Sequence, residues 1–247
     1  MTRTVPERVA AIATGLAAAI VVIALAILPF LTPAWVSFEQ GRAQALAWTG
    51  YDQAQLTTAT DSILHDLVLG PPTFDVQIAG APVLGERERA HMRDVRGVFA
   101  GFFAIAVVAA IALVVLVAGA RRSGHVERAW RAIADGMRGL AVGVVVAGVI
   151  ATFFFDAAFE LFHQLFFPRG SYDFDPRTDR LVQLFPFDFW SETTLVLGGV
   201  ILALAAVVWL LARRRARRPA VARAGGGAGD AVGDAGLAAA RAQEMPR

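Results

Sequence analysis

Two histidines are the residues of this chain best suited to move protons. His91 and His163 each follow a glutamate by three positions, His91 after Glu88 and His163 after Glu160. An imidazole accepts or donates a proton near neutral pH, and a nearby carboxylate fixes its tautomer and raises its basicity. His91 precedes one long apolar segment and His163 follows the next. The spacing therefore predicts that two distant parts of the chain bring a pair of imidazoles together.

The repeated Glu-x-x-His pattern also admits a metal centre, because two such motifs with two further glutamates form dimetal sites in helix bundles. The further glutamates considered as ligands, Glu39 and Glu192, do not stand at mid-helix positions facing a bundle core. We therefore expect no metal and no cofactor, and keep a dimetal site as a third alternative. The chain has no cysteine, which excludes disulfides, thiolate ligands and cysteine nucleophiles. Gly-x-Ser-x-Gly, phosphate-loop and dinucleotide-binding motifs are also missing.

The composition is that of an integral membrane protein. Of the 247 residues, 56% are hydrophobic, and the mean hydropathy is +0.55. A span needs roughly 20 apolar residues. Four segments satisfy this requirement: 9–31, 97–120, 139–159 and 193–212. We predict an all-α membrane protein, a bundle of four transmembrane helices with a small mixed α/β cap on its extracytoplasmic side.

Arginine sets the expected orientation, because the chain has no lysine. The short loop 121–138 carries five arginines and the segment after the last span begins RRRARR, whereas segment 33–96 has five arginines and eight acids. Arginine concentrates on the cytoplasmic side. We expect a multi-pass protein of the bacterial cell membrane with both termini cytoplasmic. The basic residues are explained by topology, so no nucleic-acid partner is expected.

The chain divides into a membrane domain, residues 1–212, and a basic tail, 213–247, which is expected to be disordered and whose basic start could hold anionic lipid. Segments 33–96 and 156–192 lie outside. In the first, Leu56, Ile63 and Leu64 give an apolar helical face, and alternation through 74–78 followed by a turn predicts a short strand. His65 in this segment is interpreted as packing or surface.

Several residues near the histidines could assist them. The carboxylates of Glu88, Asp94, Asp156 and Glu160 are candidates for orienting an imidazole, and Tyr51, Arg96 and Tyr172 are candidates for binding substrate or an oxyanion. Asp156, Glu160 and His163 share one helical face, since they stand at i, i+4 and i+7. Aromatic residues in 172–190 are expected to be mainly membrane anchors, with one or two touching substrate.

Over residues 9–212 the sequence resembles the bacterial membrane family that contains the lipoprotein intramolecular transacylase, Lit. The resemblance rests on LTP at 31–33, Tyr51, RERAHMRDVR at 87–96, FDAAFELFHQLFFP at 155–168, and the stretch 172–190. It implies a catalytic histidine pair at His91 and His163, with Asp94 and Arg96 in the same matching block.

The resemblance further implies the reaction. The sn-2 acyl chain of a diacylglyceryl lipoprotein would move to the α-amino group of its N-terminal cysteine, giving the lyso form, so the partners are membrane lipid and lipidated protein N-termini. A histidine near its ordinary pKa can take the proton of such an amine. The alternative is a non-enzymatic protein whose cap binds a lipid or a protein and whose histidines brace it. Imidazoles roughly 5 to 8 Å apart in an open cavity favour chemistry.

Overall fold

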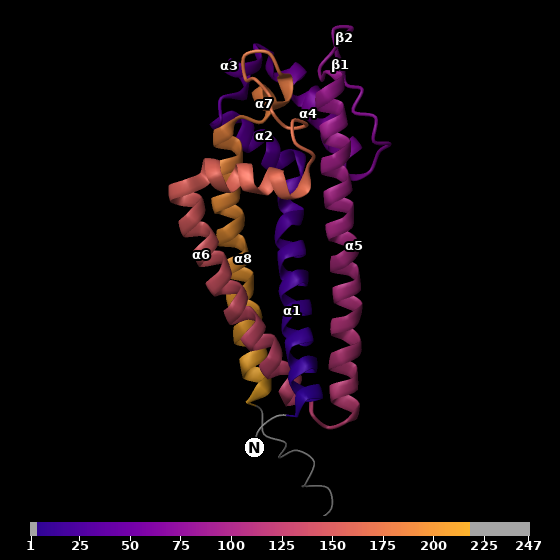
Figure 1. Ribbon diagram of the computed structural model, residues 1–247, viewed down its shortest axis with the longest axis vertical. Coiled ribbons are helices and arrows are strands. Elements are labelled where there is room, and N and C mark those ends of the chain that lie inside the picture. The colour runs from indigo at the N-terminus through magenta and orange to yellow at the C-terminus, as the bar shows by residue number, and fades with distance from the viewer. Residues whose placement is uncertain (1–3, 218–247) are drawn as a thin grey trace, which may run out of the picture.

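The computed structural model describes residues 4–217, and these form a bundle of long helices carrying a compact cap at one end (Figure 1). The elements in chain order are α1 (Val5–Ile27), the 3-10 turn η1 (Leu28–Leu31), α2 (Pro33–Arg42), α3 (Ala45–Thr49), α4 (Gln53–Val68), β1 (Gln77–Ile78), β2 (Ala81–Pro82), α5 (Glu86–Arg122), α6 (Val126–Phe166), α7 (Arg180–Leu184) and α8 (Phe187–Ala216).

All four predicted spans are helical, and four helices are long and apolar enough to cross a membrane: α1 with η1, α5, α6 and α8. Each extends beyond its predicted span, by as much as 13 residues at the start of α6 and 11 at the start of α5. The side chains of Val108 and Val114 on α5 are 66% and 68% exposed. Lipid tails accommodate such surfaces, which supports the assignment of a membrane protein.

The end of α6 turns away from the bundle axis. Phe154 has non-helical dihedral angles (φ −138°, ψ 38°), and residues after this kink run across the bundle towards α5, beneath the cap (Figure 1). Two residues earlier, Thr152 donates its hydroxyl to the carbonyl of Gly148 at 2.8 Å, a bond that bends helices. The kink brings His163 towards α5.

The half of the bundle away from the cap packs through small residues. A Cβ added to Gly136 of α6 would lie 2.5 Å from the carbonyl oxygen of Gly15 in α1, so the two backbones touch directly. Around this contact, α1, α6 and α8 bury a cluster of alanines, Val22, Ile133 and Met137. Close contact between small residues is a common way for transmembrane helices to associate.

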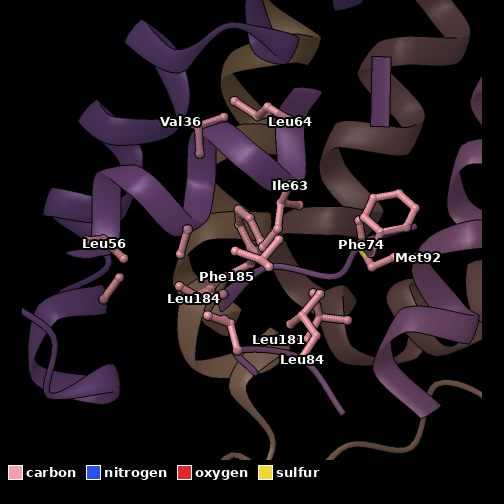
Figure 2. Close-up of a cluster of buried hydrophobic side chains, with 14 of the residues drawn as sticks. Val36, Leu56, Ile63, Leu64, Phe74, Leu84, Met92, Leu181, Leu184 and Phe185 are labelled. Carbon is pink, nitrogen blue, oxygen red and sulfur yellow. The ribbon is translucent and has the colours of Figure 1, made fainter. Parts of the chain in front are cut away.

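The cap has its own apolar core, built by α2, α3, α4, α7, the hairpin region and the start of α5 (Figures 1 and 2). The predicted apolar face of α4 is confirmed, since Leu56, Ile63 and Leu64 are all buried. Phe74, Leu84 and Leu184 complete the centre of this core and are each at most 1% exposed. Asp52 starts α4 with a capping box, its side chain accepting from the Gln55 N–H at 2.8 Å.

The mixed α/β character predicted for the cap is reduced to one tiny hairpin. The strands β1 and β2 have two residues each and are joined by Ala79 and Gly80, both with positive φ. The alternating segment 74–78 does not continue as a strand, because Phe74 also has positive φ (50°) and its N–H donates to the side chain of Asp66. The protein is therefore mainly helical, with four candidate spans.

The last helix continues past the predicted boundary at 212, because Arg213, Arg214 and Arg215 form the last turn of α8. Cations are favourable there, next to the negative end of the helix dipole. Most of the predicted tail, residues 218–247, lies outside the described residues. The division into a membrane domain and a tail stays a prediction.

Candidate functional site

The structure brings the two predicted histidines together where α5 meets the turned end of α6. The ring centroids of His91 and His163 are 6.0 Å apart, and the rings are nearly parallel, at 22°. His91 is 6% exposed and His163 is 9% exposed. The residues are 72 positions apart in the sequence, so the predicted convergence is observed. Both rings are buried, whereas an open site was expected.

Phenylalanines enclose the pair. Phe167 lies against both rings, with centroid distances of 4.7 Å to His91 and 5.4 Å to His163. Phe174 contacts His91 at 5.5 Å, and Phe159 contacts His163 at 4.2 Å. These aromatic rings exclude water from the imidazoles. Two protonated imidazoles at this spacing would repel one another, so we expect the pair to hold at most one extra proton near neutral pH.

The hydrogen bonds of the two histidines differ. The Nδ1 atom of His163 lies 2.7 Å from the backbone carbonyl oxygen of Phe159. A carbonyl oxygen only accepts, so this Nδ1 carries the hydrogen, and in the neutral ring Nε2 is left with the lone pair. The Nδ1 atom of His91 is buried and has no hydrogen-bond partner within residues 4–217.

Two of the predicted supporting residues join His163. The ring of Tyr172 lies 5.0 Å from the His163 ring, and its hydroxyl donates to Glu160 at 3.2 Å. Partial burial raises the pKa of Tyr172, and the Glu160 carboxylate raises it further. Glu160 also accepts from Gln164 at 2.9 Å. Asp156, one turn before Glu160, is exposed.

Burial and the neighbouring His163 lower the pKa of His91 to about 4, and the negative charge of the exposed Asp94, one turn along α5, opposes this shift. Asp94 is thus the carboxylate of α5 that acts on the histidine, whereas Glu88, three positions before His91, is committed elsewhere. The Glu88 carboxylate accepts from the backbone N–H of Gly85 and of Leu181, both at 2.6 Å. It therefore ties the start of α5 to α7.

Arg96 and Tyr51 also make their contacts within the cap. Arg96 donates through Nη1 to the carbonyl oxygens of Asp66 and Gly70, which end α4. The Tyr51 ring packs on the cap core, and the guanidinium of Arg180 lies over it at 5.1 Å. Their assignment as substrate or oxyanion contacts stays a prediction. His65, interpreted as packing or surface, is exposed.

The sequence alone did not identify the enclosing Phe167 and Phe174, because phenylalanine is common throughout these segments. A second omission is Glu39 of α2, which is 1% exposed, with its Oε1 buried and unpaired among the described residues. Burial raises the pKa of Glu39, and a hydrogen bond with Glu192 raises it further. The sequence pattern indicates Glu39 and Glu192 only as possible metal ligands.

The two Glu-x-x-His motifs do not gather into a metal centre. Glu88 points to backbone amides, and Glu160 points to Gln164 and Tyr172. In the chain from residue 4 to 217, no group of three histidines or acids is close enough to hold a metal ion. The donor set instead suits proton transfer by two neighbouring imidazoles in a shielded, aromatic environment.

The family model of the lipoprotein intramolecular transacylase Lit matches residues 12–190. No curated protein sequence matches. The membrane integral lipoprotein intramolecular transacylase Lit from Bacillus cereus has the same fold: its structure superposes with a TM-score of 0.70 at 16% identity, over 84% of this chain and 94% of that chain.

Two variants of the same Bacillus cereus protein, in which one histidine is replaced by arginine or by alanine, give TM-scores of 0.69 and 0.67 at 16% and 17% identity. They cover 84% of this chain and 91% and 92% of theirs. The family match spans well over half of the sequence and includes both histidines. The chain belongs to the lipoprotein intramolecular transacylase (Lit) family.

Proposed function

We propose that this protein is a membrane-embedded acyltransferase that moves an acyl chain within one diacylglyceryl lipoprotein molecule. The α-amine of the lipidated cysteine attacks the sn-2 ester carbonyl, the C–O bond to glycerol breaks, and an amide forms. The product is the lyso form of the lipoprotein. The observation that carries this proposal is the close, nearly parallel imidazole pair contributed by α5 and α6.

The reaction neither consumes nor releases a proton, so it needs no external acid or base. The attacking amine loses one proton, and the departing glyceryl oxygen gains one. We assign His163 as the base, because its Nδ1 hydrogen is held by the Phe159 carbonyl and its Nε2 lone pair can accept a proton. The proton taken up by His163 is then delivered to the departing glyceryl oxygen, while neutral His91 donates a hydrogen bond to that oxygen, so both rings return to their starting form. Amine and ester are already on one molecule, so holding them in a near-attack geometry supplies much of the rate.

The position of the pair suits a lipid substrate. His163 lies on the turned end of α6, and the opposite side of that segment exposes Leu161 (57%) and Leu165 (71%). Apolar side chains of this kind enter the boundary layer of a bilayer, where the ester of a lipid lies. Tyr172, which contacts His163, is the nearest predicted hydroxyl donor for a developing oxyanion.

The proposed orientation has the histidines on the extracytoplasmic face of the cell membrane and both termini in the cytoplasm. The arginines of the 121–138 loop and of the end of α8 support it. Reporter fusions after residue 80 and after residue 217 test this part: activity of a periplasmic-type reporter at the second position, or of a cytoplasmic one at the first, contradicts it.

The reaction is tested with purified protein and a synthetic diacylglyceryl lipopeptide in detergent micelles. Substrate and product are isomers of identical mass, so fragmentation must show whether the second acyl chain is on nitrogen or on glycerol. The variants are His91→Ala and His163→Ala, and His65→Ala is the matched control on the same side. We expect each site variant to lose at least about a hundredfold in rate, the usual size of acid–base contributions, while His65→Ala keeps its activity.

Wild-type protein that leaves the lipopeptide unchanged under conditions where it is folded contradicts the proposal. If both histidine variants remained active, only the roles assigned to the histidines would be refuted. The burial of both rings favours a second candidate, a non-enzymatic cap that binds lipidated peptides or a protein, with the histidines as packing. Such a binder retains the lipopeptide without converting it, and the same experiment distinguishes it.

A further inference from the structure

At the end of the bundle opposite the histidines, α6 and α8 line an open cavity of about 440 Å³. Four arginines and two acids provide its polar lining, which consists of Glu127, Arg131, Asp135, Arg138, Arg213 and Arg217. The lining therefore carries an excess of positive charge. The proposed acyl-transfer reaction uses none of these residues.

The acids hold two of the arginines without neutralising the cavity. Asp135 pairs with Arg138 at 3.1 Å, and Glu127 pairs with Arg131 at 3.6 Å. Within the described part of the chain, Arg213 and Arg217 form no ion pair. Positive charge that is preorganised but incompletely paired is suited to an anionic ligand.

Two of these arginines are positioned by Trp209. The guanidinium groups of Arg213 and Arg138 lie over its ring, at 5.0 Å and 5.7 Å from the centroid. Its indole Nε1 is buried and has no acceptor among residues 4–217. Trp209 also packs against the apolar cluster of α1, α6 and α8, so it holds the two guanidiniums at the edge of the cavity. Arginines that only set membrane topology would not require a cavity or this support by an aromatic ring.

We propose that this cavity binds the phosphate headgroup of an anionic glycerophospholipid. The phosphodiester oxygens would accept from the arginines, and the acyl chains would lie on the exposed apolar surface beside them. Val142, one turn along α6 from Arg138, is 65% exposed, and Leu211 of α8 is 53% exposed. Basic pockets between transmembrane helices bind anionic lipid headgroups in this way.

The test uses the purified full chain in detergent and follows thermal unfolding. Three additives are compared: dioleoylphosphatidylglycerol, dioleoylphosphatidylcholine and soluble glycerol phosphate. We expect the anionic lipid to raise the melting temperature and the zwitterionic lipid to have much less effect. Glycerol phosphate should have none, because it lacks the chains. An equal shift with glycerol phosphate would identify the ligand as a free phosphate and overturn the proposal.

The variant Arg138→Gln/Arg213→Gln removes the two guanidiniums on Trp209, and we expect it to bind the anionic lipid about tenfold more weakly or worse. The matched control is Arg121→Gln/Arg122→Gln. It removes two positive charges from the last turn of α5, at the same end of the bundle but away from the cavity. Equal losses in both double variants would show a general surface effect and refute the site. If the first double variant is unfolded, Arg131→Gln/Arg217→Gln tests the opposite wall by the same criterion.

Discussion

Replacing Glu88 by alanine should destabilise the protein far more than replacing its neighbour Glu86. The Glu88 carboxylate is 5% exposed and accepts two backbone N–H groups, from Gly85 at its own helix start and from Leu181 in α7. A buried bond to a charged acceptor contributes about 1.5–3 kcal/mol. A bond that closes a helix start contributes about 1 kcal/mol. The sum gives an expected loss of roughly 3 kcal/mol for Glu88→Ala.

Glu86 provides the control, because it stands in the same first turn of α5 but makes only surface ion pairs. Its side chain is 77% exposed and contacts Arg89 at 2.9 Å and Arg93 at 3.5 Å. Exposed pairs of this kind contribute at most about 1 kcal/mol. Glu86→Ala should therefore cost less than a third of what Glu88→Ala costs.

The two variants are compared by equilibrium unfolding in mixed detergent micelles, followed by tryptophan fluorescence. A loss below about 1 kcal/mol for Glu88→Ala, or equal losses for both variants, would refute the reasoning, because a buried N–H left without an acceptor costs more than that. If Glu88 instead orients His91 during catalysis, Glu88→Gln would lose activity while remaining as stable as the wild type. If the role of Glu88 is structural, activity and stability should fall together.

Three further perturbations test other parts of the structure. Gly136→Ala should destabilise by about 2 kcal/mol, because its Cβ would lie 2.5 Å from the backbone of Gly15 and force two helices apart. Glu39→Gln should gain stability over the wild type as pH rises above 4.5, because a carboxyl with a raised pKa holds its proton more tightly when folded, and that stabilisation fades as the unfolded state deprotonates. Glu160→Gln should lower the pKa of Tyr172, because it removes a neighbouring negative charge.

Each of these has a control. Gly139→Ala meets no atom within 4 Å and should be neutral or stabilising, so equal effects at both glycines would contradict the close contact. A Glu39→Gln curve parallel to the wild type at all pH values would show that folding does not raise the pKa of Glu39. The chain has two tyrosines. A Tyr51→Phe background therefore isolates Tyr172 in an absorbance titration, and an unchanged midpoint would separate it from Glu160.

The sequence predicted the parts of this fold that depend on hydropathy and charge alone. Four apolar segments of sufficient length became four long helices, and the apolar face of α4 became the cap core. The kink at Phe154 was not predictable, since neither proline nor glycine occupies that position and the bend depends on packing as well as on the Thr152 hydroxyl. The strand around Phe74 was overestimated, because alternation does not reveal a positive φ.

In the candidate site, too, some features could be predicted from the sequence and others could not. The pairing of His91 with His163 followed from two motifs beside adjacent apolar segments, which hydropathy places on one side of a membrane. The partner of each carboxylate was not predictable, because spacing along a helix does not say what lies opposite it. Glu88 has the spacing of an orienting residue, yet its oxygens face backbone amides from a segment 93 residues away.

The closed state of the site sets a condition on catalysis. His91 is held on α5, whose start is tied to α7 through Glu88, so this ring has little freedom to move. His163 lies instead on the turned end of α6, whose outward side chains pack on no other part of the described chain, as the 71% exposure of Leu165 indicates. An ester that reaches both imidazoles must displace Phe167, which lies against both. We therefore expect the α6 end, and not α5, to move when a lipid substrate enters.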